Sequence, residues 1–293
     1  MLSLVARDIK LAHTVFALPF AMLAVFLAGL AQRPAVDIVI TLALVLICMV
    51  LARTWAMLVN RLADREFDAA NPRTAKRVVA SGELSVRDAV RVTLGCAALF
   101  TVFAAGFGVA FGNWWPALLA LPVLAWIAAY SFTKRFTALC HVFLGGALAA
   151  SPLAAAIAVD PATLATVPAL WWIAGMVLCW VAGFDVIYAL QDLDFDRQAG
   201  LRSIPAALGW RGSAWVSRAL HLASMASLVM AWHSEPRFGA VFGAAVVVVG
   251  FVLIAEHVVL AVRREKGLEM AFFTLNGVIA CLLGAAGILD VLT

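Results

Sequence analysis

Aspartates recur every four residues in two polar stretches of this chain, and their spacing could support chemistry. In the first stretch, 60–82, an asparagine and two aspartates would share one face of a helix: Asn60, Asp64 and Asp68. Basic residues follow directly: Arg73, Lys76 and Arg77. Carboxylates in a row beside cations could hold a metal ion and a polyanion together.

The second stretch, 185–205, repeats this design. One helix face would carry four polar residues spaced by 3, 4 and 4 positions: Asp185, Tyr188, Asp192 and Asp196. Arg202 follows in the next loop. A further polar segment, YSFTKR, supplies Tyr130, Lys134 and Arg135.

Two aspartate ladders that face one another could hold Mg²⁺ ions bridged by phosphate oxygens, since Mg²⁺ takes few carboxylates and keeps water and substrate phosphates. The remaining charge of a diphosphate could be neutralised by four cations: Lys134, Arg73, Arg77 and Arg202. A diphosphate held in this way becomes a better leaving group. The alternative is that these charges only form ion pairs at a membrane surface. Two matched ladders with basic loops argue against that alternative, because carboxylates near hydrocarbon are costly.

The elements that carry these residues are membrane helices. The 293-residue chain is 65% hydrophobic and 13% charged, with a mean hydropathy of +1.02. So little polar surface cannot cover a soluble protein. The five cysteines lie scattered in apolar segments, which is typical of small core residues and not of disulfides or metal ligands. We therefore predict an all-α integral membrane protein.

Hydropathy predicts nine transmembrane helices in one bundle and a single domain, 1–293. The predicted spans are 11–31, 38–59, 91–111, 114–132, 138–158, 167–190, 213–233, 238–261 and 270–291. With a cytoplasmic N-terminus, the inner loops and adjacent helix ends hold every Lys and Arg except Arg33 and Arg237. The aspartate ladders then lie on the cytoplasmic side, and the cytoplasmic loops would cap the site. A site at the membrane also suggests a substrate with a lipid chain.

The chain resembles the UbiA superfamily of intramembrane prenyltransferases. The family's first motif, N-D-x-x-D-x-x-x-D followed by R-T-x-x-R-P…G, is matched by Asn60, Asp64, Asp68, Arg73, Thr74, Arg77 and Gly82. Its second motif, D-x-x-x-D, is similar to Asp192 and Asp196, and its Y-x-x-x-K motif to Tyr130 and Lys134. Two positions depart from the pattern. Arg61 stands where the motif usually has an aspartate, and Val78 stands where it has a proline.

The resemblance implies an enzyme that transfers a polyprenyl group from a polyprenyl diphosphate, with Mg²⁺, to an aromatic acceptor. Diphosphate departure leaves an allylic cation, the aromatic ring attacks it, and a ring proton is lost. The segment H-T-x-F-A-L-P-F at 13–20 resembles a bacterial subgroup related to 4-hydroxybenzoate polyprenyltransferase. The resemblance thus favours 4-hydroxybenzoate, ubiquinone biosynthesis and the bacterial inner membrane. A hydroxynaphthoate acceptor in the futalosine route to menaquinone is the alternative.

The motif matches, together with the positions of the remaining polar residues, give expected roles to individual residues. The expected metal ligands are Asp64, Asp68, Asp192 and Asp196. The expected substrate-binding residues are Arg53, Asn60, Arg73, Arg77, Tyr130 and Arg202. The expected catalytic residues are Asp185, Tyr188 and Lys134. The partners are then a polyprenyl diphosphate, a small aromatic acid and the lipid bilayer, with no nucleic acid.

Arg53 and Asp185 each allow two interpretations. Arg53 precedes Asn60 by two helical turns on the same face, so it could bind an aromatic carboxylate or pair with Asp64 or Asp185. Asp185 could orient the acceptor hydroxyl, accept the ring proton or pair with an arginine.

Other functions remain to be weighed against prenyl transfer. A lipid transporter or isoprenoid-binding scaffold would favour charges at the bilayer midplane, whereas here the charges gather at one face. Haem O synthase would need a haem-sized pocket, for which the sequence gives no indication. A CDP-alcohol phosphotransferase would carry a D-G-x-x-A-R pattern, which is absent.

Overall fold

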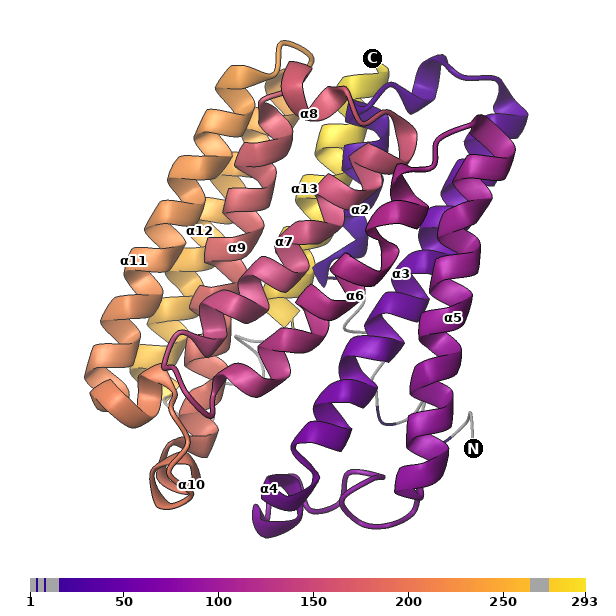
Figure 1. Cartoon of the computed structure of the whole chain (residues 1–293). Helices are drawn as coiled ribbons and strands as arrows, with labels where there is room; N and C mark the ends of the chain where they lie inside the picture. The colour runs from indigo at the N-terminus through magenta and orange to yellow at the C-terminus, as the bar shows by residue number, and fades with distance from the viewer. Residues whose placement is uncertain (1–3, 5–7, 9–15, 264–273) are drawn as a thin grey trace.

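The computed structural model describes residues 4, 8, 16–263 and 274–293, which form a helical bundle without strands (Figure 1). Five helices precede the middle of the chain: α2 (Leu18–Leu27), α3 (Ala35–Ala63), α4 (Arg65–Ala70), α5 (Val86–Phe111) and α6 (Trp115–Thr133). The others are α7 (Cys140–Val159), α8 (Thr163–Thr166), α9 (Ala169–Tyr188), α10 (Leu193–Gln198), α11 (Ile204–Ser234), α12 (Ala240–Arg263) and α13 (Asn276–Leu292). Two 3₁₀ segments, η2 (Leu30–Gln32) and η3 (Ala189–Asp192), complete the described elements.

Seven of the described helices are long and apolar enough to cross a membrane: α3, α5, α6, α7, α9 with its extension to Gln198, α11 and α12. Helices α2 and α13 are apolar but shorter. The predicted spans 11–31 and 270–291, to which they correspond, both begin outside the described residues. The all-α class and a multi-pass membrane protein are confirmed, while nine spans and a cytoplasmic N-terminus stay predictions.

Helix α3 is longer than the predicted span 38–59. At 1.5 Å per residue its 29 residues reach about 43 Å, against a hydrocarbon core of about 30 Å. Helix α3 is therefore longer than the apolar layer requires, and its last turn carries Asn60 and Arg61. In Figure 1 the short helices α4 and α10 both lie at this end of the bundle, and the C-terminus lies at the opposite end.

The core of the bundle is built around α9. Two thirds of its apolar window, 67%, is buried, because α7 and α11 pack along it. Trp180 is fully buried, and its ring meets Phe16, Phe20 and Phe184 edge-on at centroid distances of 5.1–6.3 Å. This packing fixes the helix that carries the second aspartate ladder.

Gly145 allows α7 to approach α9 closely. A methyl group at this position would lie 2.3 Å from the carbonyl oxygen of Leu178, which is backbone and cannot move aside alone. We expect Gly145→Ala to lower the free energy of unfolding by about 1–3 kcal/mol, as overpacking does. Thermal unfolding in detergent micelles measures this loss.

Gly95→Ala is the matched control, because this α5 glycine has nothing within 4 Å of the added methyl group. Its stability should stay equal or rise, since alanine favours the helix more than glycine does. Equal melting temperatures of the two variants would show that the α7–α9 contact tolerates a wider spacing.

Candidate active site

Both aspartate ladders lie where a long helix is interrupted and continues as a short one. Asp64 separates α3 from α4, yet Asp64 N–H still bonds Asn60 C=O at 2.9 Å and Asp68 N–H bonds Asp64 C=O at 2.7 Å. In the second ladder, the 3₁₀ turn η3 joins α9 to α10 and ends at Asp192. The sequence predicted that each ladder would share one helix face, and it did not predict these interruptions.

The basic loop after the first ladder binds the second ladder. Asn71 Nδ2 and Arg73 Nε each donate to Asp192 Oδ1 at 2.9 Å, and the Arg73 Nη2 group pairs with Asp192 Oδ2. The Arg73 guanidinium also lies over the Tyr188 ring, 5.7 Å from its centroid. Burial alone would lower the pKa of Arg73, but hydrogen bonding and charge attraction from Asp192 raise it. Arg73 therefore stays protonated and joins the two halves of the site.

The first ladder is surrounded by cations. Asp64 is buried and pairs with Lys134 at 3.0 Å and with Arg135 at 3.1 Å, and it accepts a hydrogen bond from Asn60 at 3.0 Å. Asp68 Oδ1 pairs with Arg77 Nη1 at 2.7 Å. The loop that begins at Lys134 thus joins the first half of the site.

The second ladder has fewer cations. Asp196 is buried and accepts a hydrogen bond from Ser203 Oγ at 2.8 Å. Ser203 Oγ also accepts a hydrogen bond from the Ala206 N–H and so caps the first turn of α11. Asp185 pairs with His141 Nδ1 at 2.7 Å, so its partner is a histidine and not an arginine. His141 comes from α7, which connects this half of the site to the core.

A polar cavity of about 590 Å³ contains twelve of the thirteen predicted site residues. They are Arg53, Asn60, Asp64, Asp68, Arg73, Arg77, Tyr130, Lys134, Asp185, Tyr188, Asp192 and Asp196. Arg202 does not line it. Its Nη1 group bonds the Phe136 carbonyl at 2.9 Å, and its backbone N–H bonds the Lys134 carbonyl at 2.7 Å. Arg202 therefore ties two loops together beside the cavity.

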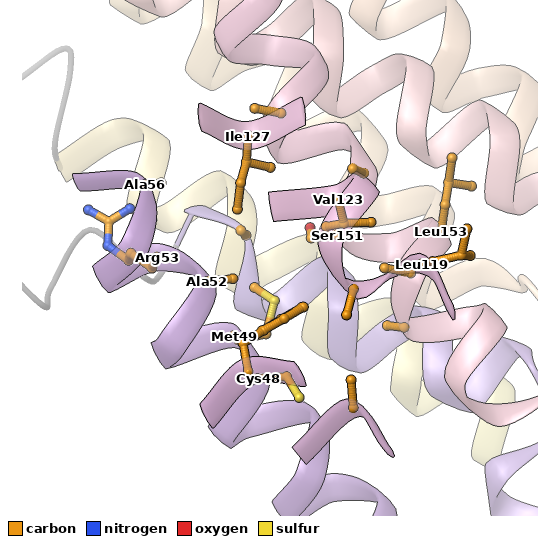
Figure 2. Close-up of a pocket in the computed structure, with 18 of the residues that line it drawn as sticks. Cys48, Met49, Ala52, Arg53, Ala56, Leu119, Val123, Ile127, Ser151 and Leu153 are labelled. Carbon is orange, nitrogen blue, oxygen red and sulfur yellow. The ribbon is translucent and has the colours of Figure 1, made fainter. Parts of the chain in front are cut away.

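An apolar cavity of about 350 Å³ adjoins the polar one, between α3, α5, α6 and α7 (Figure 2). Five residues line both cavities: Arg53, Met57, Tyr130, Leu144 and Leu148. Figure 2 shows the Arg53 guanidinium at one end of a set of small and aliphatic side chains. Its Nε atom is buried and makes no hydrogen bond among the described residues. The two cavities together suit a ligand with an anionic head and an apolar tail.

The donor atoms of the polar cavity fit a hard divalent cation. Asp68 Oδ2 is buried and has no hydrogen-bond partner within the described part of the chain, so one carboxylate oxygen is available to a ligand. No three acidic, histidine or cysteine side chains of the described residues converge as a closed metal site. Mg²⁺ does not need such a set, because it binds one or two carboxylates with water and phosphate oxygens.

Several contacts of the site were not predicted from the sequence. Asn71, Asp8 and the pairing of His141 with Asp185 join segments far apart in the chain, whereas Ser203 bonds Asp196 across the short turn between α10 and α11. Ser203 had a local signal, since a serine before an isoleucine and a proline is typical of a helix N-cap. The others had none.

Comparison with known proteins identifies the relatives of this chain. The model of the UbiA prenyltransferase family matches residues 17–278. A 4-hydroxybenzoate octaprenyltransferase of Shewanella loihica is 31% identical over 235 residues, which cover 78% of this chain and 76% of the relative. A UbiA homolog from Aeropyrum pernix K1 has a similar structure, with a TM-score of 0.83 and 32% identity over 95% of this chain and 98% of the homolog. A UbiA homolog from Archaeoglobus fulgidus bound to GPP and Mg²⁺ shares the fold at 18% identity, with a TM-score of 0.70 over 99% of this chain and 100% of that one.

Proposed function

Because the chain belongs to the UbiA prenyltransferase family and is a prenyltransferase, we propose that it transfers a polyprenyl group from a polyprenyl diphosphate to 4-hydroxybenzoate. The observation that carries this proposal is the pair of adjoining cavities. One is lined by both aspartate ladders and their cations, and the other is apolar. We place the enzyme in the bacterial inner membrane, with the site on the cytoplasmic side.

The charged residues of the polar cavity would hold the diphosphate. Lys134, Arg77 and Arg73 each pair with an aspartate, and a diphosphate could share these cations. Mg²⁺ bound by Asp64, Asp68, Asp192 and Asp196 would supply further positive charge and polarise the departing oxygen. The bond between the allylic carbon and that oxygen then breaks, and its electron pair leaves with the diphosphate.

The acceptor would bind where the two cavities meet. Its electron-rich ring carbon attacks the allylic cation, a carbon–carbon bond forms, and the ring proton is released. Asp185 and Tyr188 line the polar cavity, and the Asp185–His141 pair could receive that proton. The apolar walls exclude water, which would otherwise capture the cation.

The acceptor is tested with membranes that contain the protein, Mg²⁺, a labelled prenyl diphosphate and a panel of aromatic acids. We expect a prenylated product with 4-hydroxybenzoate. If product forms only with a hydroxynaphthoate, that compound replaces 4-hydroxybenzoate as the acceptor. The absence of product with every acceptor would contradict the proposed reaction and favour a lipid-binding or transport role.

Arg53 is proposed to bind the acceptor carboxylate, because its buried Nε atom has no hydrogen-bond partner among the described residues and its side chain lines both cavities. We expect Arg53→Ala to raise the KM for 4-hydroxybenzoate by roughly tenfold, the loss of one charge-assisted contact. The KM for the prenyl diphosphate should change little. Steady-state kinetics with each substrate varied in turn measures both.

An acceptor without a carboxylate provides the control for Arg53. With a phenol in place of 4-hydroxybenzoate, Arg53→Ala and the wild type should perform alike, because the contact is absent from both reactions. An equal loss with both acceptors would instead assign Arg53 a structural role.

A further inference from the structure

The two positions at which the chain departs from its family motif contact the same carboxylate, Asp8. Arg61 Nε pairs with Asp8 Oδ2 at 2.7 Å, and the backbone N–H of Val78 points to Asp8 Oδ1 at 3.3 Å. A proline at position 78 would have no N–H to donate. One carboxylate from the N-terminal segment thus accounts for both departures.

The Arg61 guanidinium is fixed inside the polar cavity. The side chains of Arg61 and Asp8 are only 7% and 8% exposed, and both residues line that cavity. Arg61 Nη1 donates to Asn60 Oδ1 at 3.1 Å, and Asn60 Nδ2 in turn donates to Asp64 Oδ2 at 3.0 Å. Nε and Nη1 are therefore both used to orient the guanidinium beside the first ladder.

Among the described residues, the remaining donors of Arg61 have no partner and are open to a ligand. Its Nη2 group makes no hydrogen bond to any described residue, although the side chain lines the cavity. A guanidinium is always protonated and binds phosphate oxygens through several donors in one plane. At this position the usual motif has a carboxylate, which can contact a phosphate only through a metal ion. Here the position holds a guanidinium, which can contact the phosphate directly.

Resting on the proposed function, we propose that Arg61 binds the diphosphate of the prenyl donor directly and that Asp8 positions it. The guanidinium supplies charge that a metal ion would otherwise supply at this place. Binding of the donor should therefore require less Mg²⁺ than it would without Arg61. Asp8 acts through Arg61 and is a positioning residue.

The competing interpretation is a buried ion pair that only stabilises the fold. Removing one partner would leave the other charge buried and could unfold the protein. The double variant Asp8→Asn/Arg61→Gln avoids this problem, because it removes both charges and keeps polar groups of similar size. If the pair is only structural, the double variant should bind the donor as the wild type does.

The test measures binding of a non-hydrolysable geranyl thiodiphosphate by calorimetry across a Mg²⁺ titration. The wild type, the double variant and the single variant Arg61→Ala are compared in detergent micelles. We expect the Kd of the analogue to rise by roughly tenfold in both variants, the loss of a charge-assisted contact. The Mg²⁺ concentration for half-maximal binding should rise as well.

Arg65→Ala is the matched control, since Arg65 lies one turn further along, is 47% exposed and pairs with Glu66 outside the cavity. It should bind the analogue with the wild-type Kd. If the wild type binds and the double variant equals Arg65→Ala, the role of Arg61 is overturned and the proposed function stands. If the wild type fails to bind the analogue at any Mg²⁺ concentration, the proposed function itself fails.

Discussion

Replacing Asp192 by asparagine is expected to reduce kcat/KM for prenyl transfer by roughly a thousandfold, as the loss of a group that stabilises charge in a transition state does. Asp192 accepts hydrogen bonds from Asn71 and Arg73, so it connects the two halves of the site. It is also one of the four proposed metal ligands. Asparagine keeps the shape but loses the charge that attracts both Arg73 and a cation.

Asp194→Asn is the control for this variant. Asp194 lies two residues further along, in α10, but its side chain is exposed and does not line the polar cavity. Both variants are assayed with labelled donor and with Mg²⁺ varied. Asp192→Asn should also require more Mg²⁺ for its residual activity. Equal activities of the two variants would rule out the second ladder as part of the site.

The spacing of the aspartates led to the prediction that two ladders share one site. Carboxylates four positions apart in the first ladder stay on one face even where α3 is interrupted, because the backbone hydrogen bonds donated by Asp64 and Asp68 continue the helical pattern. The charged residues also cannot lie in the lipid, so they gather at one end of the bundle. Twelve predicted residues consequently meet in one cavity.

The sequence did not predict how the two ladders connect. The bond from Asn71 to Asp192 spans 121 positions and depends on how the two halves of the bundle come together, for which no local pattern exists. The sequence also did not predict where the Arg202 side chain points, because its Nη1 group donates to the Phe136 carbonyl. The partner of Asp185 is His141, which belongs to another helix. Tertiary packing decides such contacts.

The apolar cavity sets a distance along α7 with which the length of the prenyl chain can be compared. Its residues on α7 begin at Leu144 and Leu148, which also line the polar cavity, and continue through Ser151 and Ala154 toward the other end of the helix. At 1.5 Å per residue, Ala154 lies about 9 Å beyond Leu148 along the helix axis. A donor whose diphosphate is held at the aspartates would pass this position only if its chain is long.

We therefore expect Ala154→Trp to block long donors selectively. Transfer from octaprenyl diphosphate should fall by roughly a hundredfold, the cost of forcing a large side chain into occupied space. Transfer from geranyl diphosphate should stay near the wild-type rate, since a short chain ends before Ala154. Competition between the two labelled donors in one reaction measures the change directly.

Ala125→Trp adds the same side chain to the exposed face of α6, outside the cavity, and should leave the preference between donors unchanged. Equal rates of Ala154→Trp and Ala125→Trp with octaprenyl diphosphate would mean that the chain follows another route. A lower transfer rate with both donors would mean that Ala154→Trp disturbs the site that binds the diphosphate. Only a loss confined to the long donor identifies the apolar cavity as the binding site of the prenyl tail.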